Sequence, residues 1–310
     1  MRRLLLLLAI LLSACESPAP PLKLGSNQWP GYEPLYLARQ LGHLDPGRVK
    51  LVELPSSSDV MQHLRDGNLQ AAMLTLDEVI TLQSEGLPLR VILVLDVSLG
   101  ADSVLARPEI QHPADLAGRR IGVETTAVGA VMLESLLEKA GLSEDQIRLI
   151  HLTVDRHEAA YRQGRIDAVI TFEPTRSRLL ALGARELFSS RDIPGRIIDV
   201  LAVEARAARQ RSRQLEHLVD AYFRARDYLA RHRSQALARM APRLELSPEE
   251  LEWALQGLHL PDRRENRRWL APNGTLRQNA SRLARLMRRW RLILHRPDLD
   301  QLADDRFIAP

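Results

Sequence analysis

The feature that most constrains the fold is an internal duplication, in which segments of the first half of the chain recur in the same order further along. Residues 65–74 (RDGNLQAAML) correspond to residues 162–171 (RQGRIDAVIT) at an offset of 97 residues, and in both a glycine separates a helical pattern from an apolar strand. Residues 49–54 (VKLVEL) and 147–152 (IRLIHL) share a strand-like alternation at an offset of 98 residues. Each copy therefore predicts one βαβαβ unit.

Both units also begin with a short strand, at residues 22–25 and 120–123, that leads into a helix. Parallel strands joined by right-handed crossovers form a sheet with helices on both faces. The duplication thus predicts an α/β chain with two lobes, each built on a parallel-core sheet. Because such sheets bind ligands beyond the carboxyl ends of their strands, we expect the two sets of strand ends to face each other across a cleft.

Residues that follow the predicted strands are the candidate ligand-binding residues. Asp77 and Glu173 end the third strand of each lobe, and carboxylates from two walls would hold a cationic or hydrogen-donating group. Trp29 and Tyr32 lie in a turn interrupted by proline and glycine, where aromatic side chains would form a wall for a small ligand. The alternatives are acids exposed at the cleft rim and aromatics packed in the core.

The turn before the predicted helix of the second lobe adds a different chemistry. Thr125 and Thr126 would cap this helix, whose free N–H groups and dipole favour an anionic ligand group, although an ordinary cap without a ligand is the alternative. Ser58, Asp102 and Glu124 complete the predicted site. A ligand with both an anionic and a cationic end, such as taurine, suits this set, a pyrimidine amine suits its acids and aromatics, and nitrate suits it less well.

Three motifs carry a family resemblance: WPGYEPLYLARQLG at residues 29–42, ADLAGRRIGV at residues 114–123 and GRIDAVITFEP at residues 164–174. They resemble the substrate-binding protein family of bacterial ABC importers for nitrate, taurine and aliphatic sulfonates, which also contains thiamine-pyrimidine precursor binders. The resemblance implies the type II periplasmic binding protein fold, in which the chain crosses twice between the lobes.

This resemblance also implies the domain boundaries. Residues 22–97 and 194–310 would form the first lobe with its C-terminal helices, and residues 98–193 would form the second lobe. Within the last part of the chain, residues 276–295 form a basic, amphipathic helical pattern. This helix is expected either to contact anionic lipid or an acidic partner, or to pack its apolar side on the first lobe.

The N-terminal segment resembles a bacterial lipoprotein signal. Two arginines precede the apolar run at residues 4–12, which is too short for a permanent membrane helix. The sequence Leu12-Ser13-Ala14-Cys15 resembles the lipobox, in which the chain is cleaved before an acylated cysteine. We therefore expect residues 1–14 to be a signal peptide, Cys15 to carry lipid and residues 15–21 to form a tether. The alternative for Cys15 is a buried structural cysteine.

Composition excludes several kinds of site. Cys15 is the only cysteine in the sequence, which excludes an internal disulfide and any zinc or iron–sulfur site with several cysteines. The net charge of +4 lacks the excess typical of a nucleic-acid binder. The sequence contains no G-x-S-x-G, P-loop or H-E-x-x-H motif. We therefore expect no catalytic residue, cofactor, metal or nucleic acid.

Together these features predict a lipid-anchored, monomeric solute-binding protein of an ABC importer at the periplasmic face of a bacterial membrane. Its lobes would close on a small organic solute, such as taurine, a sulfonate or a related amine-bearing compound, and present it to a permease. Two alternatives remain open at this point. The protein would be an occupancy sensor that partners a membrane signalling protein, or it would act in thiamine-pyrimidine precursor binding or synthesis.

Overall fold

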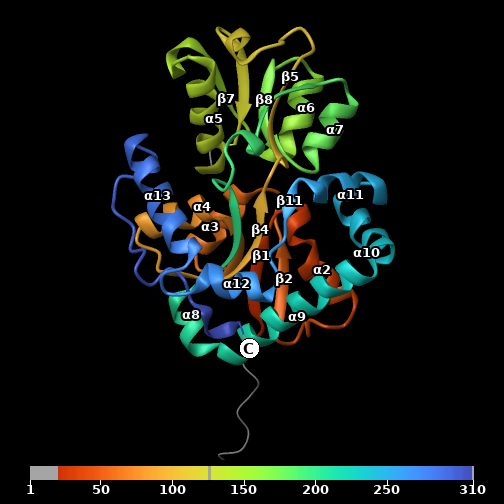
Figure 1. Cartoon of the computed structure of the whole chain (residues 1–310), viewed down its shortest axis with the longest axis vertical. Helices are drawn as coiled ribbons and strands as arrows, with labels where there is room; N and C mark the ends of the chain where they lie inside the picture. The colour runs from red at the N-terminus through yellow and green to blue at the C-terminus, as the bar shows by residue number, and fades with distance from the viewer. Residues whose placement is uncertain (1–19, 125–126, 309–310) are drawn as a thin grey trace, which may run out of the picture.

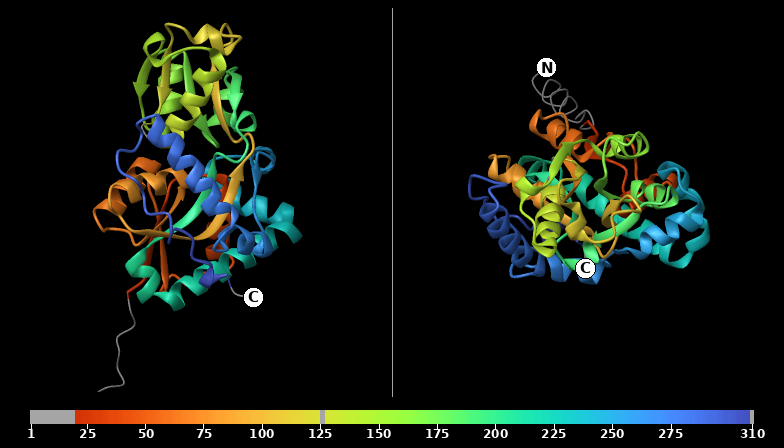
Figure 2. Two further views of the ribbon diagram at one scale, coloured as in Figure 1. Left: turned by 60° about the vertical axis from the view of Figure 1, so that its left-hand side comes forward. Right: turned by 90° about the horizontal axis from the view of Figure 1, so that it is seen from above.

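The computed structural model describes residues 20–124 and 127–308, so residues 1–14, Cys15, Thr125 and Thr126 lie outside the described residues. The strands form two sheets, one in each of two stacked lobes (Figure 1, Figure 2). The larger lobe holds a sheet in the order β11-β4-β10-β3-β1-β2, and the smaller lobe holds a sheet in the order β7-β6-β8-β5-β9. The strand bounds are β1 Leu22–Ser26, β2 Val49–Glu53, β3 Ala71–Thr75, β4 Leu89–Ser98, β5 Asp102–Ala106, β6 Arg120–Val123, β7 Arg148–His151, β8 Ala168–Phe172, β9 Arg185–Ser189, β10 Ile198–Glu204 and β11 Leu258–His259.

Helices cover both sheets (Figure 1). The α-helices are α2 Glu33–Gln40, α3 Ser57–Arg65, α4 Leu76–Ser84, α5 Ala127–Ala140, α6 His157–Arg162, α7 Thr175–Ala181, α8 Ala205–Gln210, α9 Ser212–Arg231, α10 Arg233–Met240, α11 Pro248–Gln256, α12 Arg263–Leu270 and α13 Thr275–Arg289. The 3₁₀ turns are η1 Pro30–Tyr32, η2 Pro113–Leu116, η3 Glu144–Gln146, η4 Val154–Arg156, η5 Ser190–Asp192, η6 Ala241–Leu244 and η7 Asp305–Phe307. Helices α5, α6 and α7 belong to the smaller lobe, and the C-terminal helices wrap the larger one.

The core of each sheet is parallel, as the duplication predicted. Strand β1 pairs in parallel with β2 and β3, and strand β6 pairs in parallel with β7 and β8. Each sheet also contains antiparallel strands, because β10 runs against β3 and β4, and β5 runs against β8 and β9. All five residues of β3, AAMLT, are buried, which fits a strand covered by helices on both faces.

The chain passes between the lobes twice, from β4 to β5 and from β9 through η5 to β10. These two passages contact each other through a buried hydrogen bond of 2.8 Å between the hydroxyls of Ser98 and Ser190. The amide of Gly100 also donates to the Ser190 hydroxyl at 2.6 Å. The two connections between the lobes are therefore joined by hydrogen bonds to the Ser190 hydroxyl.

Helix α13 is the basic helix expected near the C-terminus. Its apolar side chains, Leu276, Leu283 and Met287, are buried, and the helix packs against α4 of the larger lobe. Its arginines, including Arg282 and Arg285, are exposed. Of the two expectations, the structure therefore supports packing of the apolar side on the first lobe. Within the described ranges, no helix combines the length and the apolar composition that crossing a membrane requires.

Candidate functional site

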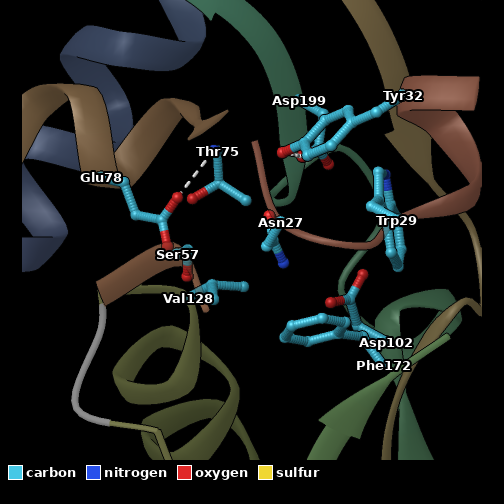
Figure 3. Close-up of a pocket in the computed structure, with 10 residues that line it drawn as sticks. All are labelled: Asn27, Trp29, Tyr32, Ser57, Thr75, Glu78, Asp102, Val128, Phe172 and Asp199. Carbon is cyan, nitrogen blue, oxygen red and sulfur yellow. Dashed lines mark hydrogen bonds between the residues drawn. The ribbon is translucent and has the colours of Figure 1, made fainter. Parts of the chain in front are cut away.

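A small pocket, with a cavity of about 20 Å³, lies between the two sheets (Figure 3). Both lobes contribute to its walls. The larger lobe supplies the loop after β1, η1, the N-terminal ends of α3 and α4, and β10, and the smaller lobe supplies β5, α5 and the end of β8. The lining residues are Asn27, Trp29, Tyr32, Ser57, Thr75, Glu78, Asp102, Val128, Phe172 and Asp199.

The loop after β1 holds two aromatic side chains against two buried carboxyl groups. The Nε1–H of Trp29 donates to Asp96 Oδ2 at 2.9 Å, and the hydroxyl of Tyr32 donates to Asp199 Oδ1 at 2.6 Å. Gly31 permits this arrangement, because a Cβ at this position would overlap the Asp96 carboxyl and crowd the Trp29 ring nitrogen. The WPGY segment therefore forms one wall of the pocket.

Asp96 and Asp199 are neighbours across the antiparallel pair of β4 and β10. Burial raises the pKa of Asp96, and the hydrogen bond from Trp29 opposes that rise. Burial and the neighbouring Asp96 charge raise the pKa of Asp199 well above its usual range. Burial and the nearby acids therefore favour the protonated form of both carboxyl groups.

The N-terminal end of α4 places two more acids at the cleft. Glu78 Oε2 accepts a hydrogen bond from the Thr75 amide at 3.0 Å, which holds the side chain against the start of its own helix. Burial and the adjacent Asp77 charge raise the pKa of Glu78. Asp77 is 1% exposed, and burial raises the pKa of its carboxyl as well. Helix α4 therefore presents Glu78 to the pocket and holds Asp77 beside it.

Asp102 begins β5 and contributes the carboxyl of the smaller lobe. It stands opposite Phe172 in the β5–β8 pairing, and the Phe172 ring meets Trp29 edge to face at a centroid distance of 5.7 Å. The Asp102 side chain is 4% exposed, and burial raises its pKa to about 7, with smaller contributions from the charges of Asp77 and Glu173. Figure 3 shows the Asp102 carboxyl below Trp29 and beside Phe172.

Two hydrogen-bonded contacts join the lobes beside the pocket. The hydroxyl of Ser58 in α3 donates to Glu124 Oε1 at 2.8 Å, and the Ser58 amide donates to the same oxygen at 3.2 Å. In a second contact, Arg178 Nη2 of the smaller lobe donates to the Leu244 carbonyl at 2.8 Å and to Glu245 at 3.0 Å. The structure therefore has its lobes in contact on both sides of the pocket.

The predicted site residues take different places. Trp29, Tyr32 and Asp102 line the pocket, and Ser58 and Glu124 form the contact between the lobes beside it. Asp77 is buried next to the lining residue Glu78. Glu173 does not line this pocket: its Oε1 lies 3.0 Å from Arg176 Nη1, and its Oε2 accepts a hydrogen bond from the Ser177 amide at 3.1 Å. Thr125 and Thr126 lie outside the described residues.

Sequence reasoning missed three carboxyl groups of this site. Glu78 directly follows the predicted Asp77, and its role depends on which of the two acids the first turn of α4 turns inward. Asp96 and Asp199 lie within the apolar segments VILVLDV and IIDVLAV. An acid inside an apolar strand is rare because burying it is costly, so its presence there was the signal that these positions serve a site.

Both lobes place acids at the pocket, with Glu78 and Asp199 from the larger lobe and Asp102 from the smaller one. None of the lining residues named above is a lysine or an arginine. In the parts of the chain that the structure describes, no group of three or more His, Cys, Asp or Glu side chains is arranged to hold a metal ion. The arrangement suits an organic molecule with an apolar body, held between Trp29, Tyr32 and Phe172, and with hydrogen-donating groups directed at the carboxyls.

Comparison with known proteins places the chain in a family. The NMT1/THI5 like family model matches residues 29–236. No curated protein sequence gives a significant match.

Solved structures share the fold. The alkanesulfonate-binding protein SsuA from Xanthomonas axonopodis pv. citri is 21% identical with a TM-score of 0.76, and the match covers 90% of this chain and 96% of that one. The nitrate-binding protein NrtA from Synechocystis PCC 6803 is 13% identical with a TM-score of 0.73, covering 93% and 87%. The desulfurization enzyme DszB is 22% identical with a TM-score of 0.68, covering 94% and 98%. Identities this low establish the shared fold alone.

The predicted two-lobed fold, with a parallel-core sheet flanked by helices in each lobe, is thus confirmed by the structure and by these neighbours. The match to the family model extends over more than half of the chain and agrees with the resemblance of the three sequence motifs. This protein belongs to the NMT1/THI5-like family.

Proposed function

We propose that this protein is a lipid-anchored, extracytoplasmic solute-binding protein that captures a small organic solute between its lobes and delivers it to an ABC permease. The observation that carries this proposal is the position of the pocket, which both lobes enclose. Trp29 of one lobe contacts Phe172 of the other, and Ser58 bonds Glu124 across the same cleft. A solute in this pocket would touch both walls and would therefore stabilise the closed arrangement of the lobes.

The proposed moving bodies are residues 22–97 with 194–310, and residues 98–193. The hydrogen bond between Ser98 and Ser190, where the two connections between the lobes meet, is suited to act as the hinge. Neighbours named as alkanesulfonate-binding and nitrate-binding proteins support a binding role for this fold. The lipobox-like sequence ending at Cys15 supports export and anchoring at the periplasmic face of a membrane.

The described walls favour a solute that bears an amine over a plain anion. In taurine or a related aminosulfonate, the ammonium end would meet the carboxyls, and Thr125 and Thr126 would receive the sulfonate end, as the sequence predicts. We further propose that the protein binds its solute without converting it. DszB shares this fold and is named as an enzyme, so turnover has to be measured.

The test is recovery of the natural solute. The lipoprotein is purified from membranes in detergent and denatured, and the released small molecules are identified by mass spectrometry. Returning the recovered compound to solute-free protein should raise its melting temperature, by an amount equivalent to about 2.7 kcal/mol at one hundred times Kd, and should reduce the radius of gyration in solution scattering.

Three results would contradict the proposal. Recovery of a chemically altered product after incubation would identify an enzyme. Binding without a change in the radius of gyration would argue against closure between the lobes. Co-purification with a membrane kinase or cyclase in place of a permease would identify the protein as an occupancy sensor.

A further inference from the structure

We propose that the pocket takes an organic cation whose positive charge lies on N–H groups, an amidinium or a primary ammonium, held by Asp102, Glu78 and Asp199. This inference rests on the proposed function, since it names the solute class of the same site. It differs from the sulfonate and nitrate in the names of the structural neighbours, which are anions.

The first argument is the balance of charge at the pocket. Glu78, Asp102 and Asp199 line it, Asp77 precedes Glu78 in the first turn of α4, and Asp96 accepts a hydrogen bond from Trp29. These five side chains are between 0% and 4% exposed. No lysine or arginine stands among the described lining residues. Opposite charges attract strongly where water is excluded, and like charges repel as strongly, so such walls admit a cation and reject an anion.

The second argument is the set of hydrogen-bond acceptors left without donors. Within the described parts of the chain, Asp102 Oδ2, Glu78 Oε1, Asp199 Oδ2 and Thr75 Oγ1 are buried without a hydrogen-bond partner. Figure 3 shows these side chains on different sides of one opening, with Glu78 and Thr75 across the pocket from Asp102. A buried hydrogen-bond acceptor without a donor costs free energy. A ligand with several N–H groups would donate hydrogen bonds to these oxygen atoms. A quaternary ammonium has no such donors.

The third argument comes from the other buried acids of the same chain. Glu33 is 0% exposed and accepts a hydrogen bond of 2.6 Å from Arg243, while Glu173 is 1% exposed and lies 3.0 Å from Arg176. These two buried carboxylates therefore each have an arginine partner. The pocket carboxyls have none among the described residues, and this difference supports a counter-charge that comes from outside the chain.

The aromatic residues distinguish an organic cation from a metal ion. Trp29, Tyr32 and Phe172 contribute apolar surface to the lining, which a bare divalent ion does not need. A planar cation gains from aromatic faces and edges around it, both by contact area and by attraction to the ring electrons. The cavity of about 20 Å³ has room for about one water molecule, so an organic cation would enter only when the two lobes move apart.

Ligand binding should also release protons. Burial raises the pKa of Asp102 to about 7, and the carboxyls that face it are Asp77 and Glu173, with the Ser98 hydroxyl donating a hydrogen bond. The pocket is thus partly protonated near neutral pH, and a bound cation favours the ionised form. The affinity for a cation that keeps its own charge should therefore rise between about pH 6 and pH 8.

The experiment uses three probes that share a phenyl ring and differ in the head group: benzamidine, phenyltrimethylammonium and benzenesulfonate. Each is titrated by calorimetry into the lipoprotein after its natural solute has been removed. We expect benzamidine to bind at least about tenfold more tightly than either of the other probes. Asp102→Asn should weaken benzamidine binding by at least about tenfold. Glu249→Gln, which changes an exposed acid of α11 that does not line the pocket, should leave the affinity unchanged.

Each other outcome overturns the inference. Tighter binding of benzenesulfonate assigns the pocket to anions, and equal binding of phenyltrimethylammonium removes the role of the N–H groups. Displacement of benzamidine by calcium or magnesium chloride would identify a metal site. The absence of benzamidine binding up to about 10 mM would also refute the inference that the pocket takes an organic cation. If a circular dichroism melt shows that Asp102→Asn fails to fold, Glu78→Gln serves as the second variant. None of these results affects the experiment that recovers the natural solute from the purified protein. The proposed function is therefore tested independently of this inference.

Discussion

Asp102→Asn should make the solute-free protein more stable, and increasingly so as the pH rises. The carboxyl of Asp102 is 4% exposed and faces Asp77 and Glu173, and burial raises its pKa from 3.8 to about 7. A buried acid with a raised pKa stabilises the folded state while it is protonated. As the pH rises from the unfolded to the folded pKa, the folded protein keeps a proton that the unfolded chain releases, and stability falls.

The magnitude follows from this pKa difference. About three pKa units correspond to about 4 kcal/mol of lost stability once Asp102 is fully ionised. The loss accumulates at about 1.4 kcal/mol for each pH unit between about pH 4 and pH 7 and is constant above that range. The asparagine side chain has nearly the same shape as that of aspartate but carries no charge, so the variant does not lose this stability as the pH rises. The difference in unfolding free energy between the variant and the wild type should therefore grow by about 2–3 kcal/mol from pH 5 to pH 8.

Urea unfolding, followed by tryptophan fluorescence at pH 5, 6, 7 and 8, measures this difference. Other groups titrate over the same pH range in both proteins. Their contributions to the unfolding free energy therefore largely cancel when the variant is compared with the wild type. Glu249→Gln is the control, since it replaces an exposed acid that does not line the pocket. A difference for Asp102→Asn that stays constant or shrinks as the pH rises would refute the assignment of a buried carboxyl with a raised pKa at this position.

Three further predictions concern other parts of the molecule. Ser58→Ala removes the hydroxyl bond to Glu124 and should weaken binding of the natural solute by about 3- to 10-fold in calorimetry; unchanged affinity would show that this contact does not stabilise closure. Arg243→Met leaves Glu33 buried without its partner and should lower the unfolding free energy by about 3–5 kcal/mol in urea, whereas an unchanged urea midpoint would contradict the pairing. Cys15→Ser should abolish incorporation of labelled palmitate, and a variant that still takes up label would exclude Cys15 as the anchor.

Much of the fold followed from local pattern. The repeated segments predicted two parallel-core sheets because strand alternation and helix-ending glycines depend on neighbouring residues in the chain. The strand-end rule then led to Trp29 and Tyr32, which line the pocket. The direction of strands β5 and β10 could not be predicted from the sequence. Their partners are distant in the chain, and the same apolar pattern suits parallel and antiparallel pairing.

The candidate site was only partly predictable, because the environment of a carboxyl group is a property of three-dimensional distance. Glu173 and Asp77 both follow the third strand of their repeat, yet Glu173 is paired with Arg176 and Asp77 has no basic partner among the described residues. Asp96 and Asp199 looked like isolated acids in apolar strands until the pairing of β4 with β10 placed them side by side.

By itself, therefore, the sequence determined the architecture and which ends of the strands would meet. The tertiary structure decided which acids face the pocket and which acids are paired with an arginine. The physical reason is that hydrophobic patterns repeat with the period of a strand or helix and can be recognised from neighbouring residues. Desolvation and charge pairing depend on distances of a few ångströms between side chains that are brought together only by folding.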